Sequence, residues 1–87
     1  MPSAFSSDRY AVLAEVLARA RQDAGMSQVE LAARLKRPQS YVSNVERRER
    51  RVDVVDFYDW AIAVSANPKA LFGVVCNRLA DGDSNKS

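Results

Sequence analysis

Residues 27–47 read SQVELAARLKRPQSYVSNVER, and this stretch predicts two short helices joined by a tight turn. The first helix begins at Ser27, because Ser27 and Glu30 have the spacing of a capping box that satisfies free backbone N–H groups. Pro38 fits only the start of a helix, and it disfavours helical geometry in the residue before it. The turn therefore falls at residues 36–37, and the second helix occupies the rest of the stretch.

The two helices have apolar residues at positions that can close a contact between them. Ala32 leaves room for a close approach, and the larger contact residues are Leu31, Leu35, Val42 and Val45. Two short helices at this spacing form a helix-turn-helix.

The second of these helices leaves small and medium hydrogen-bonding side chains for solvent, namely Gln39, Ser40, Ser43 and Asn44. Amides of this kind pair bidentately with adenine, and hydroxyls can donate to or accept from a base edge. The face is therefore a candidate for reading DNA, and the alternative is an ordinary hydrated helix surface.

The rest of the chain also carries helical patterns and lacks the sustained apolar–polar alternation of strands. A helix is expected from about residue 7 or 8 to residue 24, where Gly25 ends it. A fourth helix should start after Asp53 and a fifth should run from about residue 68 to 79. The inward faces of these three helices are expected to comprise Tyr10, Leu13, Val16, Leu17 and Ala20, then Val54, Phe57, Trp60, Ala61 and Val64, and then Leu71, Phe72, Val75 and Leu79.

These patterns predict a compact all-α domain of five helices over residues 8–79. Residues 1–7 are expected to form a flexible N-terminus, and the polar residues 80–87 a disordered tail. With 87 residues, 47% of them hydrophobic and 28% charged, the chain has the size and composition of one ordinary globular domain.

Composition also limits the class of function. No apolar run approaches the roughly 20 residues that span a bilayer, and the first residues do not resemble a secretory signal. The single cysteine, Cys76, cannot form an internal disulfide, so the cytoplasm is the expected compartment. The chain has no histidine, no cysteine cluster and no glycine-rich phosphate loop, so we expect no enzyme, metal, cofactor or small-molecule ligand.

Positive charge is concentrated in one segment. Between Arg34 and Arg51 there are seven basic and two acidic residues, a net of +5 in a chain whose total is +2. Such a basic segment is expected of a protein that contacts the phosphate backbone of DNA, and a hydrated charged surface is the alternative.

The stretch from about Val12 to Phe72 resembles the phage-repressor and Cro type of helix-turn-helix, the XRE family. The resemblance is carried by SQVELA at residues 27–32, by QSYVSNVE at 39–46 and by the pattern AxxVxxNPxxLF that ends at Phe72. It implies a lambda-repressor-like fold and a sequence-specific transcriptional regulator. The expected regulator is a repressor, able to act on its own gene, that binds double-stranded DNA as a homodimer in the nucleoid of a prokaryotic or phage system.

The resemblance also implies roles for single residues. Gln39, Ser40, Ser43 and Asn44 would face bases, while Arg21 and Glu46 would form a structural ion pair. The expected contacts to DNA phosphate are Gln28, Lys36, Arg37, Tyr41, Arg47, Arg48 and Arg50. For Tyr41, a half-buried packing role is the open alternative.

The chain departs from the family pattern at three positions. Lys36 and Arg48 stand where glycine is usual, and Pro38 replaces the usual hydroxyl cap of the recognition helix. A lysine at this point must take a left-handed conformation or shift the turn. An antitoxin or protein-interaction module with weak or no independent DNA binding, and a partner such as a toxin, therefore stays open as an alternative.

Overall fold

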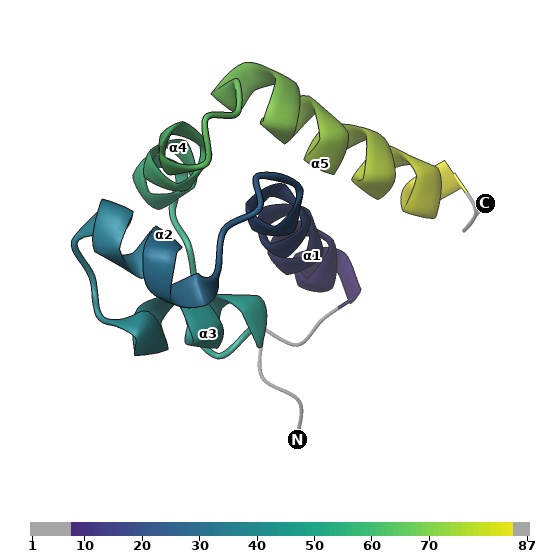
Figure 1. Ribbon diagram of the computed structural model, residues 1–87. Coiled ribbons are helices and arrows are strands. Elements are labelled where there is room, and N and C mark those ends of the chain that lie inside the picture. The colour runs from purple at the N-terminus through teal and green to yellow at the C-terminus, as the bar shows by residue number, and fades with distance from the viewer. Residues whose placement is uncertain (1–7, 85–87) are drawn as a thin grey trace.

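The computed structural model describes residues 8–84, and these residues form five α-helices without a strand (Figure 1). The helices are α1 (Asp8–Asp23), α2 (Gln28–Leu35), α3 (Gln39–Glu46), α4 (Val54–Ala63) and α5 (Pro68–Ser84). The predicted all-α fold of five helices is therefore confirmed. The predictions for residues 1–7 and for residues 85–87 of the tail lie outside the described residues.

Helix α1 lies in the middle of the arrangement, with α2 and α3 to one side and α5 across the other (Figure 1). The centre of the core is Trp60 of α4, whose side chain is fully buried together with Leu17, Leu31 and Val42. The indole Nε1–H of Trp60 donates to the backbone oxygen of Leu17 over 3.0 Å. This bond satisfies a polar group that burial would otherwise leave without water, so α4 is tied to α1.

The turn between α2 and α3 keeps its geometry although a lysine replaces glycine. Lys36 adopts left-handed angles, φ 57° and ψ 44°, and its backbone N–H donates to the oxygen of Ala33. The N–H of Arg37 donates to the oxygen of Ala32 over 3.0 Å. Pro38 then has extended angles and makes no side-chain cap, so α3 starts one residue later than predicted.

Replacing Lys36 with glycine is expected to raise the free energy of unfolding by up to about 1 kcal/mol. A left-handed conformation costs a residue with a Cβ roughly 1–2 kcal/mol, and the greater freedom of glycine in the unfolded chain offsets part of that gain. Denaturant titration measures the change, with Ala33→Gly in the regular part of α2 as the control, which should lose about 1 kcal/mol. If Lys36→Gly lowered the free energy of unfolding as much as the control does, the left-handed conformation of Lys36 would not be strained.

Two expectations about burial on α4 and α5 are wrong. Val54 is 83% exposed, because as the first residue of α4 it lies beyond the helices that cover Phe57 and Trp60. Phe72 is also exposed, although its ring makes an edge contact with Phe57 at a centroid distance of 5.7 Å. On α1 the fully buried positions include Ala11 and Ala14, whereas Leu13, Tyr10 and Ala20 are only partly buried.

Helix α5 continues five residues past the predicted end at Leu79, so residues 80–84 are helical rather than part of a disordered tail. A polar composition does not by itself end a helix. Leu79 packs against the core, and the segment contains no proline that would stop the helix.

Candidate nucleic-acid interface

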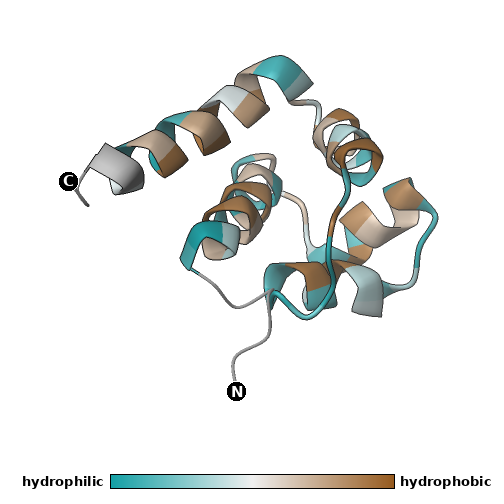
Figure 2. Ribbon diagram, turned by 180° about the vertical axis from the view of Figure 1, so that it is seen from behind, coloured by the Kyte–Doolittle hydropathy of each residue, from teal (hydrophilic) through white to brown (hydrophobic). Residues whose placement is uncertain are grey.

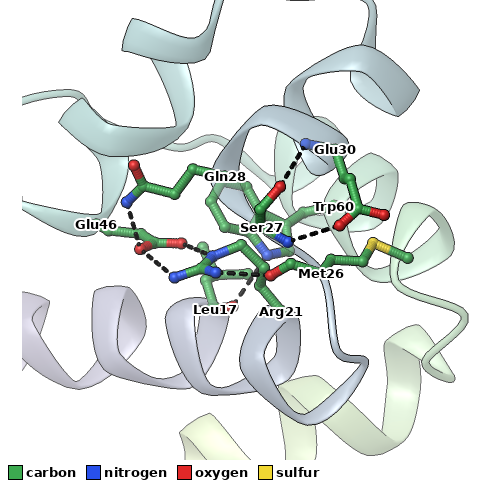
Figure 3. Close-up of polar contacts among 8 residues, drawn as sticks. All are labelled: Leu17, Arg21, Met26, Ser27, Gln28, Glu30, Glu46 and Trp60. Atoms are coloured by element: carbon green, nitrogen blue, oxygen red, sulfur yellow. Dashed lines mark hydrogen bonds and ion pairs between the residues drawn. The ribbon is translucent and has the colours of Figure 1, made fainter.

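The start of α2 is fixed by the capping box that the sequence predicts. The hydroxyl of Ser27 accepts from the backbone N–H of Glu30 over 3.0 Å, and the Ser27 N–H donates to the Glu30 carboxylate over 3.1 Å (Figure 3). The reciprocal bonds hold Gln28 as the first residue of the helix.

A network of charged and polar side chains ties α1, α2 and α3 together (Figure 3). Arg21 donates from Nε and Nη2 to the two carboxylate oxygens of Glu46, over 2.6 and 3.0 Å, and from Nη1 to the Met26 oxygen over 2.7 Å. The side chains of Arg21 and Glu46 are only 12% and 10% exposed. The hydrogen bond with Glu46 raises the pKa of Arg21 above its ordinary value, so the guanidinium stays charged at neutral pH.

The same carboxylate orients Gln28. The amide Nε2 of Gln28 donates to Oε1 of Glu46 over 3.0 Å, and the amide oxygen points away from the pair (Figure 3). A phosphate accepts hydrogen bonds and does not donate them, so the predicted phosphate contact would use the second N–H of this amide. That contact stays a prediction, but the ion pair that the resemblance implies is present in the structure.

Helix α3 has one face in the core and one face in solvent. Val42 and Val45 are buried, whereas Gln39 and Ser40 are exposed, and Ser43 and Asn44 one turn later are partly exposed. The Ser43 hydroxyl lies 3.5 Å from the backbone oxygen of Ser40, to which it donates. The four predicted base-reading side chains therefore share the solvent side of one rigidly packed helix. Their contacts to DNA stay a prediction.

The end of α3 carries a pair that the sequence does not reveal. Nη2 of Arg47 donates to Oδ1 of Asn44 over 2.6 Å and also lies 3.2 Å from Oε1 of Glu49. Arg47 was expected to contact phosphate, and Asn44 to read a base. The structure brings these two side chains together.

Tyr41 lies deeper than its predicted place on the flank of α3, since only 7% of its surface is exposed. Its ring lies under two guanidinium groups, those of Arg37 and Arg50, at 4.4 and 5.3 Å from the ring centroid. Arg37 also pairs with Asp56 over 3.3 Å. Burial raises the pKa of Tyr41 above its ordinary value, so its hydroxyl stays protonated at neutral pH. Of the two roles predicted for Tyr41, packing is the one that its burial supports.

Three further basic residues of the predicted segment lie in two different environments. Lys36 in the turn and Arg48 after α3 are exposed, and Arg48 takes a left-handed φ of 65° where glycine is usual in the family. Arg34 instead donates from Nη1 to the backbone oxygen of Ala63 at the end of α4, over 3.2 Å. This contact joins residues 29 positions apart and could not be predicted from the sequence.

Among the described residues, no group of three or more cysteine or carboxylate side chains is placed to hold a metal ion. No helix within residues 8–84 is long and apolar enough to cross a membrane.

Comparison with known proteins agrees with this geometry. A family model described as a helix-turn-helix domain matches residues 12–61. A solved XRE-family-like protein from Pseudomonas syringae pv. tomato is 46% identical, with 80% of this chain and 85% of that chain covered and a TM-score of 0.75. The restriction-modification controller protein C.AhdI from Aeromonas hydrophila is 33% identical, with 70% and 92% covered and a TM-score of 0.64.

A third solved structure, the controller protein C.Esp1396I as a tetramer with its natural 35 base-pair operator, is 19% identical. It has a TM-score of 0.76, with 86% of this chain and 99% of that chain covered, so it shares the fold. A search of curated proteins finds no match.

Proposed function

The chain belongs to the XRE family of helix-turn-helix proteins, and we propose that it regulates transcription by reading a specific DNA sequence with α3. The observation that carries this proposal is the two-sided character of α3. Its inner face is locked into the core through Val42 and Val45, while its outer face presents two serine hydroxyls and two amides. A rigid helix with such groups on one face suits the major groove, where each base pair has its own pattern of donors and acceptors.

Positive charge around α3 supports binding to the DNA backbone. Lys36 lies in the turn before the helix, and Arg48 and Arg50 lie in the loop that follows it. Lysine and arginine at phosphates release counterions, so the affinity for DNA should fall steeply as the salt concentration rises. A protein-interaction module with the same fold would lack this dependence. Lys36 takes the left-handed angles that glycine adopts readily, which supports DNA binding over that alternative.

Replacing Gln39 with alanine should weaken binding to a specific site by about 1–3 kcal/mol, because an exposed amide at the start of α3 is lost. Binding to unrelated DNA should change little, since the positive charges remain. Titration of a selected duplex and of a scrambled duplex with both proteins separates these two effects. Gln22→Ala, an exposed glutamine on α1, is the matched control. Unchanged specific affinity in Gln39→Ala would refute the assignment of α3 as the reading helix.

We propose further that the protein acts as a homodimer through an apolar surface on α4 and α5, along which hydrophobic residues recur (Figure 2). Seven large hydrophobic side chains are exposed among residues 8–84, and six of them form this α4–α5 patch: Val54, Val55, Tyr58, Ile62, Phe72 and Val74. Several of these residues border a pocket of about 430 Å³ with mostly apolar walls. Exposed apolar side chains in such number are typical of an interface, and a two-fold pair would place two α3 helices on successive turns of DNA.

Tyr58→Glu with Ile62→Glu should abolish the dimer, because two charges would be buried between the copies. Sedimentation velocity should then give a monomer, and affinity for a two-fold symmetric DNA site should fall by at least about tenfold through loss of the second half-site. Val29→Glu, an exposed valine outside the patch, is the control and should keep the wild-type mass. A double variant that remains dimeric would exclude this surface.

The proposal also covers the mode of action. A protein bound at its own promoter blocks transcription without catalysis, a cofactor or a ligand, so we infer a self-regulating repressor that works in the nucleoid of a prokaryotic or phage-infected cell. The identity of 33% to a restriction-modification controller protein supports a regulatory role. Transcription from the promoter in the presence and absence of the purified protein tests the sign of the effect.

A further inference from the structure

The amide of Asn44 is held in one orientation by Arg47. A guanidinium group has only donors, so the amide atom that faces Nη2 of Arg47 at 2.6 Å must be the oxygen, Oδ1. The NH₂ group of Asn44 is therefore the part of the amide that remains for another partner. The same Nη2 of Arg47 also donates to Oε1 of Glu49 over 3.2 Å.

This orientation changes what Asn44 can recognise. An unconstrained asparagine reads adenine with both ends of its amide, because Oδ1 accepts from the N6 amino group while Nδ2 donates to N7. Here one lone pair of Oδ1 already accepts from a cation, and the positive charge beside it disfavours the approach of the adenine amino group to the other lone pair. Guanine instead presents two acceptors, N7 and O6, in the same groove. The Asn44 NH₂ group and the remaining N–H groups of Arg47 are all donors, and they match that edge.

We infer that Arg47 is a positioning residue that leaves the NH₂ group as the main recognition group of Asn44, and that the pair selects guanine over adenine at one position of the DNA site. The inference rests on the proposed function, because it needs α3 in the major groove. Asn44 lies in the last turn of α3 and is partly exposed, and Arg47 is the exposed residue that caps the end of this helix. Arg47 therefore acts on the base sequence through Asn44, in addition to any contact with phosphate.

Selection from a pool of randomised double-stranded oligonucleotides tests the inference with the intact protein. The base pair read by Asn44 is the one at which Asn44→Ala loses its preference. Wild type should prefer guanine there by about tenfold or more, within the range of a good side-chain–base pair. Arg47→Met keeps the length of the side chain and removes the guanidinium, so the preference should change to adenine.

Two further variants separate specificity from charge. Arg50→Met removes the same charge from the loop and keeps the backbone bond from Arg50 to Asn44, so it should weaken all sequences alike while the guanine preference stays. Asn44→Ala combined with Arg47→Met should lose the adenine preference that Arg47→Met alone creates. Thermal unfolding followed by circular dichroism checks that each variant is folded before its preference is compared.

The outcomes distinguish this inference from the function on which it rests. A preference for guanine in wild type that changes to adenine in Arg47→Met supports the inference. If wild type prefers adenine, or if wild type and Arg47→Met prefer the same base, the inference is overturned. Sequence-specific binding by α3 is then unaffected. A pool from which wild type enriches no sequence overturns both, and Gln39→Ala should then behave like wild type on every duplex.

Discussion

Val45→Asp is expected to unfold the domain at room temperature. Val45 is a residue of α3 that is only 1% exposed. It packs in the same apolar cluster as the fully buried Leu31 and Val42. A carboxylate at this position would be buried in an apolar cluster, and the substitution also removes the apolar contacts of the valine. The combined cost is about 4 kcal/mol or more, which is most of the stability that a domain of this size has.

Circular dichroism during thermal unfolding measures this effect. Val29→Asp introduces the same carboxylate at a valine that is 58% exposed, and its midpoint should stay close to that of wild type. A cooperative transition of Val45→Asp near the wild-type midpoint would show that α3 does not pack on the core through this residue.

Glu46→Ala should lower the free energy of unfolding by about 2–3 kcal/mol, because it removes the acceptor of three hydrogen bonds from Arg21 and Gln28. The Arg21 guanidinium would then remain almost buried with only the Met26 oxygen as a partner among the contacts of this network. The effect is large because a partly desolvated cation loses its counter-charge. Urea titration of both proteins gives the difference directly.

The matched control is Glu49→Ala. Glu49 pairs with Arg47 over 3.2 Å, but its side chain is 61% exposed, so this pair should contribute less than about 1 kcal/mol. If the two substitutions cost the same, the network around Arg21 would have no special role in joining α1 to α3.

The helix starts and the turn could be predicted because they follow from local chemistry. Ser27 and Glu30 are three residues apart and cap α2 as expected, Asp53 and Asp56 do the same for α4, and Gly25 takes the positive φ that ends α1. Such features depend on a few neighbouring residues, and their geometry is nearly independent of the rest of the fold. The same holds for most of the core, since its apolar residues recur with helical spacing.

The depth of single side chains could not be predicted, because it depends on which helices lie above them. Tyr41 is in the core and Val54 is in solvent, although the sequence pattern placed the first on a flank and the second in the core. Spacing defines a face of a helix but does not define where the covering helices end.

The orientation of the base-reading side chains lies beyond sequence reasoning for a similar reason. The residues of the exposed face were identified from composition and resemblance, yet the bond from Arg47 to Asn44 depends on two side-chain conformations. The contact of Arg34 with the end of α4 likewise needs the packing of two helices to be known first.

The most direct test of the central claim is the binding of the protein to a labelled DNA fragment from immediately upstream of its own gene. The titration is run at low and at moderate salt, each with excess unrelated DNA. We predict a discrete complex that survives the competitor, weakens as the salt concentration rises and is lost in Gln39→Ala at the same protein concentration. Absence of any complex at low salt, or a complex that unrelated DNA displaces fully and that Gln39→Ala forms equally well, would contradict the claim that α3 reads this DNA.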